Sequence, residues 1–181
     1  MIGVAVLWFS VGSALLITHF DVLAALPISY LGVYDTSKFL FNGGLILSSL
    51  MFIIFARFLN KQLHASLIFF QVFLCGQICQ IIVALTPYDS QSIIRQIHVI
   101  AAFALAFCLP ASMYVFMVSG QVAQSLRNTT KWFFYAEVLL FSAGIGTFIF
   151  ASTAGALSEI VTAVAFDMWI VWLSLFAASN D

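Results

Sequence analysis

Residues 65–85 read ASLIFFQVFLCGQICQIIVAL and contain no charged side chain. A helix that crosses the hydrocarbon core of a bilayer needs about 20 mostly apolar residues, at a rise of about 1.5 Å each. This stretch has that length. Its apolar residues run continuously instead of alternating, which favours a helix over a strand of a membrane barrel. The stretch therefore predicts a transmembrane helix.

Similar apolar stretches lie on both sides of this one, and with it they give six expected spans: residues 2–20, 39–56, 65–85, 97–119, 132–152 and 159–178. Hydrophobic residues make up 64% and charged residues 7% of the 181-residue chain, and the mean hydropathy is +1.13. A water-soluble domain would have about 25% charged residues. The sequence therefore predicts an all-α fold, a polytopic transmembrane bundle of six helices in a single domain from residue 1 to residue 181.

The Lys and Arg residues at the ends of the spans predict the orientation of the bundle. Loops on the cytoplasmic side of a membrane carry an excess of these residues. Four of them lie on one side and two on the other: Arg57, Lys61, Arg127 and Lys131 against Lys38 and Arg95. We therefore expect both termini in the cytoplasm, and the location to be a prokaryotic cytoplasmic (inner) membrane.

Polar side chains gather at the outer ends of the spans. Asn42 begins the second span, Asp89 lies in the second outer loop, and Glu159 begins the sixth span, while Arg95 and His98 share one face of the fourth. The depths of His98 and Glu159 agree to within about one 5.4 Å helical turn. An unpaired buried carboxylate is costly. We therefore expect His98 and Glu159 to be in contact or separated by one water.

Such an outward-facing pocket predicts the binding or processing of a lipid headgroup or an amphiphile. His98 would be the general base or headgroup ligand, and Glu159 its carboxylate partner. Arg95 would bind phosphate or carboxylate. The remaining pocket side chains would bind and orient the ligand: Ser29, Asn42 and Asp89. No strong catalytic motif such as Gly-x-Ser-x-Gly is present, so the sequence leaves open whether the protein is an enzyme.

Two other interpretations of the same residues stay open. In the first, their roles are structural: His98 is bonded to a loop carbonyl, Asp89 caps a helix and Asn42 is a packing amide. In the second, His98, Asp89 and Glu159 hold zinc or manganese, since one imidazole and hard oxygen ligands suit these ions. We predict no cofactor, and the divalent metal is the minor alternative.

Two acidic residues, Glu137 and Asp167, lie inside predicted spans. A charge at the bilayer centre costs about 2.5–3.5 kcal/mol on insertion scales, so such groups usually have a partner or face a cavity. One interpretation is a small proton- or cation-coupled transporter. The other is a pair of protonated carboxyls bonded to glutamines of the third span, Gln71, Gln77 or Gln80, that hold helices together. We expect the two acids at different depths, in separate sites.

A third class of function is a non-catalytic scaffold subunit, as a homo-oligomer or beside a partner membrane subunit. Membrane lipids are the expected partners in every case, and no basic patch indicates nucleic acid. Cys75, Cys79 and Cys108 all fall inside predicted spans, where we interpret them as packing residues.

Several short motifs occur in a characteristic order along the chain: ISYLG at 28–32, FNGGLI at 41–46, TPYD at 86–89, Ile97-His98, a Gly-x-x-x-Glu start to the sixth span at 155–159, and Trp169 and Trp172. This order resembles the six-span prokaryotic family called domain of unknown function 998. The family is similar to eukaryotic autophagy-modulator and lipid-remodelling six-span proteins, which implies lipid handling, although a shared fold does not transmit function. One position departs from the pattern. Ile160 follows Glu159 where the family pattern has Arg, so a Glu-Arg ion pair would need Arg95 instead.

Overall fold

The computed structural model describes residues 1–22, 26–86, 88, 93–151 and 155–178. These residues form six α-helices and one short 3-10 helix, with no strand among them: α1 (Ile2–Thr18), η1 (Ile28–Gly32), α2 (Lys38–Gln62), α3 (Leu67–Leu85), α4 (Ile93–Val118), α5 (Gln124–Ala151) and α6 (Gly155–Ala178). The predicted all-α fold is confirmed.

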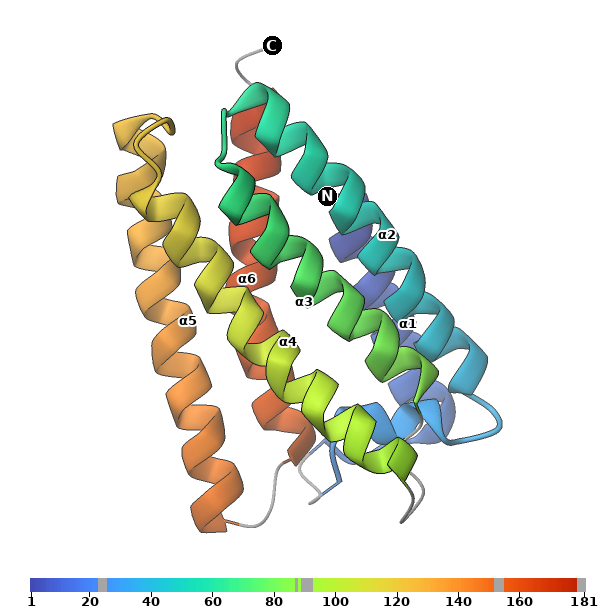
Figure 1. Ribbon diagram of the computed structural model, residues 1–181. Coiled ribbons are helices and arrows are strands. Elements are labelled where there is room, and N and C mark those ends of the chain that lie inside the picture. The colour runs from blue at the N-terminus through green and yellow to red at the C-terminus, as the bar shows by residue number, and fades with distance from the viewer. Residues whose placement is uncertain (23–25, 87, 89–92, 152–154, 179–181) are drawn as a thin grey trace.

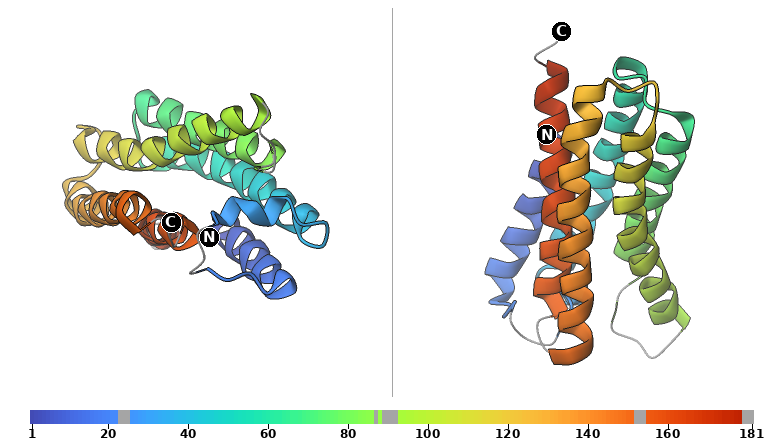
Figure 2. Two further views of the ribbon diagram at one scale, coloured as in Figure 1. Left: turned by 90° about the horizontal axis from the view of Figure 1, so that it is seen from below. Right: turned by 90° about the vertical axis from the view of Figure 1, so that its left-hand side faces the viewer.

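The helices pack in two layers of three (Figure 1 and Figure 2). Helices α2, α3 and α4 form one layer, and α6 lies between α1 and α5 in the other. Consecutive helices pack against each other in antiparallel pairs, whereas α1 makes few contacts with α6. The amino group of Met1 donates a hydrogen bond to Ser174 Oγ near the end of α6, at 3.3 Å. The start of α1 and the last turns of α6 therefore lie at the same end of the bundle.

Four of the helices are long and apolar enough to cross a membrane, judged on the described residues: α2, α3, α4 and the 20 residues Glu159–Ala178 of α6. Helix α1 is apolar but has 17 residues. The first half of α5 contains Arg127, Lys131 and Glu137. Large apolar side chains such as Phe39 and Leu139 are exposed on the outside of the bundle. These are the helices of an integral membrane protein. Which end of the bundle faces the cytoplasm stays a prediction.

The helices extend beyond the predicted spans at the end of the bundle that carries four basic residues. Helix α2 continues past Arg57 and Lys61, and α5 begins before Arg127 and Lys131. The prediction that these residues lie in loops was therefore wrong. Hydropathy ends a span at the first charge, but Lys and Arg are good helix formers and the helices continue through them.

An aromatic cluster fills the space between α3, α4 and α6: Phe69, Phe73, Phe116, Phe166 and Trp169. The rings of Phe69, Phe116 and Trp169 meet edge to face, with centroids 5.4–6.3 Å apart. This is the geometry that aromatic quadrupoles favour. The indole N–H of Trp169 also donates to Thr130 Oγ1 at 3.1 Å. The cluster thus joins the two layers, and the hydrogen bond to Thr130 connects α5 to it as well.

Helices α1 and α2 approach each other closely where Gly44 faces Ser10. A Cβ atom built on Gly44 would overlap Ser10 Cβ and Oγ, whereas one built on the neighbouring Gly43 would meet nothing within 4 Å. Gly44 and Ser10 are both buried, and Gly43 is exposed. The small residues at this crossing therefore set the distance between the two helices.

Candidate functional site

The carboxylate of Glu159 binds the backbone of the first loop. The N–H of Ile28 donates to Glu159 Oε2 at 2.9 Å, and the N–H of the buried Ser29 also faces this carboxylate. One turn earlier in α6, the N–H of Ala156 donates to the carbonyl of Leu26 at 3.0 Å. Ile28 and Ser29 are the first residues of η1, whose N–H groups have no acceptor within so short a helix. Glu159 therefore caps η1 and fixes it to the start of α6.

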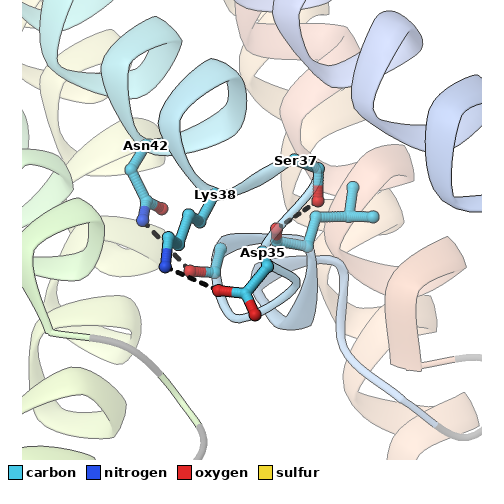
Figure 3. Close-up of polar contacts among 6 residues, drawn as sticks. Asp35, Ser37, Lys38 and Asn42 are labelled. Atoms are coloured by element: carbon cyan, nitrogen blue, oxygen red, sulfur yellow. Dashed lines mark hydrogen bonds and ion pairs between the residues drawn. The ribbon is translucent and has the colours of Figure 1, made fainter.

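Asn42 holds the other end of η1 (Figure 3). Its Nδ2 donates to the carbonyl of Gly32 at 3.2 Å, and the hydroxyl of Ser37 donates to the carbonyl of Leu31 at 2.7 Å. A Cβ atom on Gly32 would overlap Asn42 Oδ1. A side chain at position 32 would therefore displace the Asn42 amide from this contact. The first loop is thus fastened to both α2 and α6.

Lys38 and Asp35 form an ion pair of 2.6 Å beside this loop, with 39% and 92% of their side chains exposed. The hydrogen bond and the charge of Lys38 lower the pKa of Asp35 from the ordinary value. Exposed pairs of this kind contribute little to stability.

His98 is buried and turns toward the end of α3. Its Nδ1 bonds the carbonyl oxygen of Thr86; since a carbonyl can only accept, Nδ1 carries the proton. The ring of Tyr88 meets the His98 ring edge to face at 5.4 Å. Arg95 lies over the same tyrosine ring, 4.8 Å from its centroid, and donates to the Tyr88 hydroxyl at 3.1 Å. His98 and Arg95 therefore bind the two described residues between α3 and α4, Thr86 and Tyr88.

No direct hydrogen bond joins His98 to Glu159 within the described residues, so the expected direct contact is not found, and a separation by one water stays a prediction. Each of them binds the backbone of a different loop instead. Arg95 does not replace the missing arginine after Glu159 either, because it binds Tyr88. Asp89 lies outside the described residues. Within them, no three His, Cys, Asp or Glu side chains lie close enough together to hold a metal ion.

Asp167 lies in the middle of α6 and is 4% exposed. The indole N–H of Trp8, on α1, donates to its Oδ2 at 2.8 Å. The expected glutamine partners of the third span point elsewhere: Gln80 donates to Ser48 Oγ at 2.9 Å, on α2, and Gln77 Oε1 has no partner among the described residues. Gln80 thus bonds α2 and not α6, since its Nε2 also donates to the carbonyl of Leu45 on α2, at 3.2 Å.

Glu137 is fully buried, and neither of its carboxyl oxygens has a hydrogen-bond partner in the described part of the chain. It lies on α5, which packs against α6, the helix that carries Asp167. Because α5 begins at Gln124, Glu137 is about 20 Å from that end of the bundle, and Asp167 is about 16 Å from the same end. The two acids therefore lie at similar depth, which corrects the expectation of different depths.

A groove of about 480 Å³ runs along α6 between α1 and α5, where the contacts of α1 with α6 are sparse. Asp167 lines it, and Trp8 does so from α1. The rest of its wall is apolar and includes Val4, Phe133, Met168, Trp172 and Leu175. Phe133 lies one helical turn from Glu137 on the same face of α5. An intramembrane acid thus opens into an apolar groove, while the second acid lies buried nearby.

Trp8 was not predicted as the partner of Asp167, because the apolar residues around it do not indicate which neighbouring helix this side of α1 faces. Comparisons of the chain with protein-family models, with curated proteins and with solved structures found no match. The resemblance to the domain of unknown function 998 family therefore stays a prediction. The chemistry of the side chains is the basis for a functional conclusion.

Proposed function

We propose that the protein binds hydrophobic cations in the groove at Asp167 and exchanges them for protons, with Glu137 as the neighbouring proton site. The supporting observation is a single one: an aspartate carboxyl at the middle of α6 opens into an otherwise apolar groove. Ligand sites are commonly apolar cavities of about 300–1,000 Å³ with a few polar groups that fix orientation. The Asp167 groove has this size and composition.

The charges around Asp167 support a cation as the ligand. Lys38 and Asp35 form an ion pair with each other, and neither of them lines the groove. No Lys or Arg side chain lines the groove. A carboxylate charge at this depth must then be balanced by a proton or by a bound cation. Trp8 orients the carboxyl but, as a neutral donor, it does not balance its charge.

Glu137 supports the exchange part of the proposal. A fully buried carboxyl without hydrogen-bond partners is unusual, since most buried polar groups have one. Two neighbouring carboxyls interact, so that the charge state of one changes the proton affinity of the other. A cation that binds at Asp167 would therefore displace a proton from the pair. Both carboxyls release or accept whole protons in this scheme, and no other reactant is needed.

The outer-end residues give less support to the alternative of a lipid headgroup pocket. His98, Arg95, Asn42 and Glu159 each bind a backbone carbonyl, a backbone N–H or a tyrosine hydroxyl. None of them lines the Asp167 groove. The structural interpretation of this cluster is the better supported one. A scaffold subunit remains the conclusion that follows if the groove binds no cation.

Tetraphenylphosphonium and tetraphenylborate test the proposal, since they have the same shape and opposite charge. We expect the purified protein in neutral detergent to bind the cation and not the anion by equilibrium dialysis. Asp167→Asn should weaken binding of the cation at least about tenfold, because a charge pair near 4 Å at an effective dielectric constant of 20 contributes more than the 1.4 kcal/mol this represents. The amide oxygen still accepts from Trp8, so the fold is kept.

Asp35→Asn is the matched control, since it removes one carboxylate from an exposed loop and should leave binding unchanged. Glu137→Gln should keep both cation binding and the release of the Asp167 proton, but should shift the pH at which that proton is released, measured with a pH indicator in weakly buffered solution. Equal binding of the two ions, or unchanged binding in Asp167→Asn, would contradict the proposal and leave the scaffold interpretation.

A further inference from the structure

We propose a second binding site, for an anionic phospholipid, in the groove between the end of α2 and the start of α3. This groove has a volume of about 490 Å³. Its polar part consists of Arg57, Asn60 and Lys61, and its apolar part includes Ile54, Leu67 and Phe70. It lies on the opposite layer of the bundle from the Asp167 groove, and its side chains have no part in the proposed cation exchange.

Two positive charges face the same groove without a partner of opposite charge. Arg57 and Lys61 are four residues apart on α2 and therefore share a helix face. Both are exposed, neither forms an ion pair within the described chain, and no acidic residue lines the groove. Like charges at this spacing repel each other. A phosphate between them would relieve the repulsion and accept hydrogen bonds from both side chains and from the Asn60 amide.

The order of polar and apolar groups along the groove matches a phospholipid. Arg57 and Lys61 lie in the last turns of α2, at the end of the bundle, whereas Ile54 is one turn further into the helix. On α3, Phe70 lies about one turn in from the first residue, Leu67. Ile54 and Leu67 are 60% and 64% exposed, so that their surfaces are free to contact an acyl chain. A headgroup at the basic residues thus places its chains beside these apolar side chains.

The basic residues of α5 favour the same class of lipid at this end. Arg127 and Lys131 lie in the first turns of α5. The start of α5 and the end of α2 lie at the same end of the bundle (Figure 1). Clusters of Lys and Arg at one membrane surface attract anionic lipids by about 1 kcal/mol for each residue. Lys131 lies over the ring of Tyr135 and outside the α2–α3 groove. Lys131 therefore adds positive charge to the same end of the bundle as Lys61, but it is not part of the α2–α3 groove.

Native mass spectrometry of the delipidated protein tests the site, after exposure to an equimolar mixture of dioleoylphosphatidylglycerol and dioleoylphosphatidylcholine. We expect the wild-type protein to retain the anionic lipid in preference to the neutral one. Lys61→Gln and Arg57→Gln should each reduce this preference about fivefold, the equivalent of about 1 kcal/mol. Lys131→Gln, which removes the same charge from the same end of the bundle, should change it less than twofold.

Soluble glycerol phosphate distinguishes a lipid site from a site for free phosphate. It carries the headgroup charge without acyl chains, and we expect it not to displace the bound phosphatidylglycerol. Phe70→Ala should weaken lipid retention while Arg57 and Lys61 are intact, because it removes part of the apolar wall. Displacement by glycerol phosphate would overturn the lipid proposal. So would equal losses in Lys61→Gln and Lys131→Gln, which would mean that surface charge alone attracts the lipid.

Discussion

Gly44→Ala is expected to lower the free energy of unfolding by about 1–3 kcal/mol, the range measured for overpacked interiors. The new methyl group would overlap Ser10 Cβ, which is attached directly to the backbone of α1 and cannot turn away as a hydroxyl can. The two helices must therefore move apart, and the packing of the whole α1–α2 pair weakens. Unfolding of the purified protein in a mixed micelle with increasing denaturing detergent measures this change.

Gly43→Ala is the matched control for this prediction. The added methyl group meets nothing within 4 Å, and alanine favours a helix over glycine by about 1 kcal/mol in water. Unfolding of this variant should occur at the same or higher detergent concentration. The double variant Ser10→Gly with Gly44→Ala should regain part of the loss, because the glycine removes the overlapping atom. Equal stability of Gly43→Ala and Gly44→Ala would contradict the close crossing.

Glu159→Ala is expected to lower the free energy of unfolding by about 1.5–3 kcal/mol, the usual contribution of a hydrogen bond to a charged group. The change removes the acceptor of the Ile28 N–H and separates η1 from the start of α6. Glu159→Gln keeps an oxygen at the same place and should lose less. Trypsin cleavage at Lys38, next to the loop, should become faster in Glu159→Ala than in Glu159→Gln.

Asp35→Ala provides the comparison for Glu159→Ala. It also removes a carboxylate from the first-loop region, but this one is exposed and pairs only with Lys38. We expect its unfolding to match that of the wild type. If Glu159→Ala behaves in the same way as Asp35→Ala, then Glu159 does not cap η1, and a role in ligand binding becomes the better explanation for this residue.

The helices could be predicted from the sequence because apolar length is a property of each segment alone. The level of the polar residues was also predictable, since Asn42, His98 and Glu159 do lie near helix ends at one end of the bundle. Their partners were not. These are the backbone N–H of Ile28 and the carbonyls of Gly32 and Thr86. Every residue has such groups, so no pattern of side chains marks the ones that are used.

The pairing of Asp167 with Trp8 was hidden for a different reason. The pairing depends on how far α6 is rotated about its axis and on which helix packs beside α6 on the Asp167 side. Uniformly apolar helices leave both open, because lipid-facing and core-facing residues are equally apolar. The error in the depth of Glu137 has a simpler origin. The start of α5 lies upstream of Lys131, within a stretch whose charges ended the predicted span.

The sparse seam between α1 and α6 has a consequence for the order in which the protein is built. Helix α1 is translated before every other helix of the bundle, and α6 after them. Trp8 therefore enters the bilayer long before Asp167 exists, and its indole N–H has no carboxylate to bind until the last helix is inserted. Formation of the contact between α1 and α6 is then the final step of assembly. A nascent chain that stalls after α5 has no α6, so the side of α1 that carries Trp8 stays exposed to the insertion machinery and to quality-control proteases.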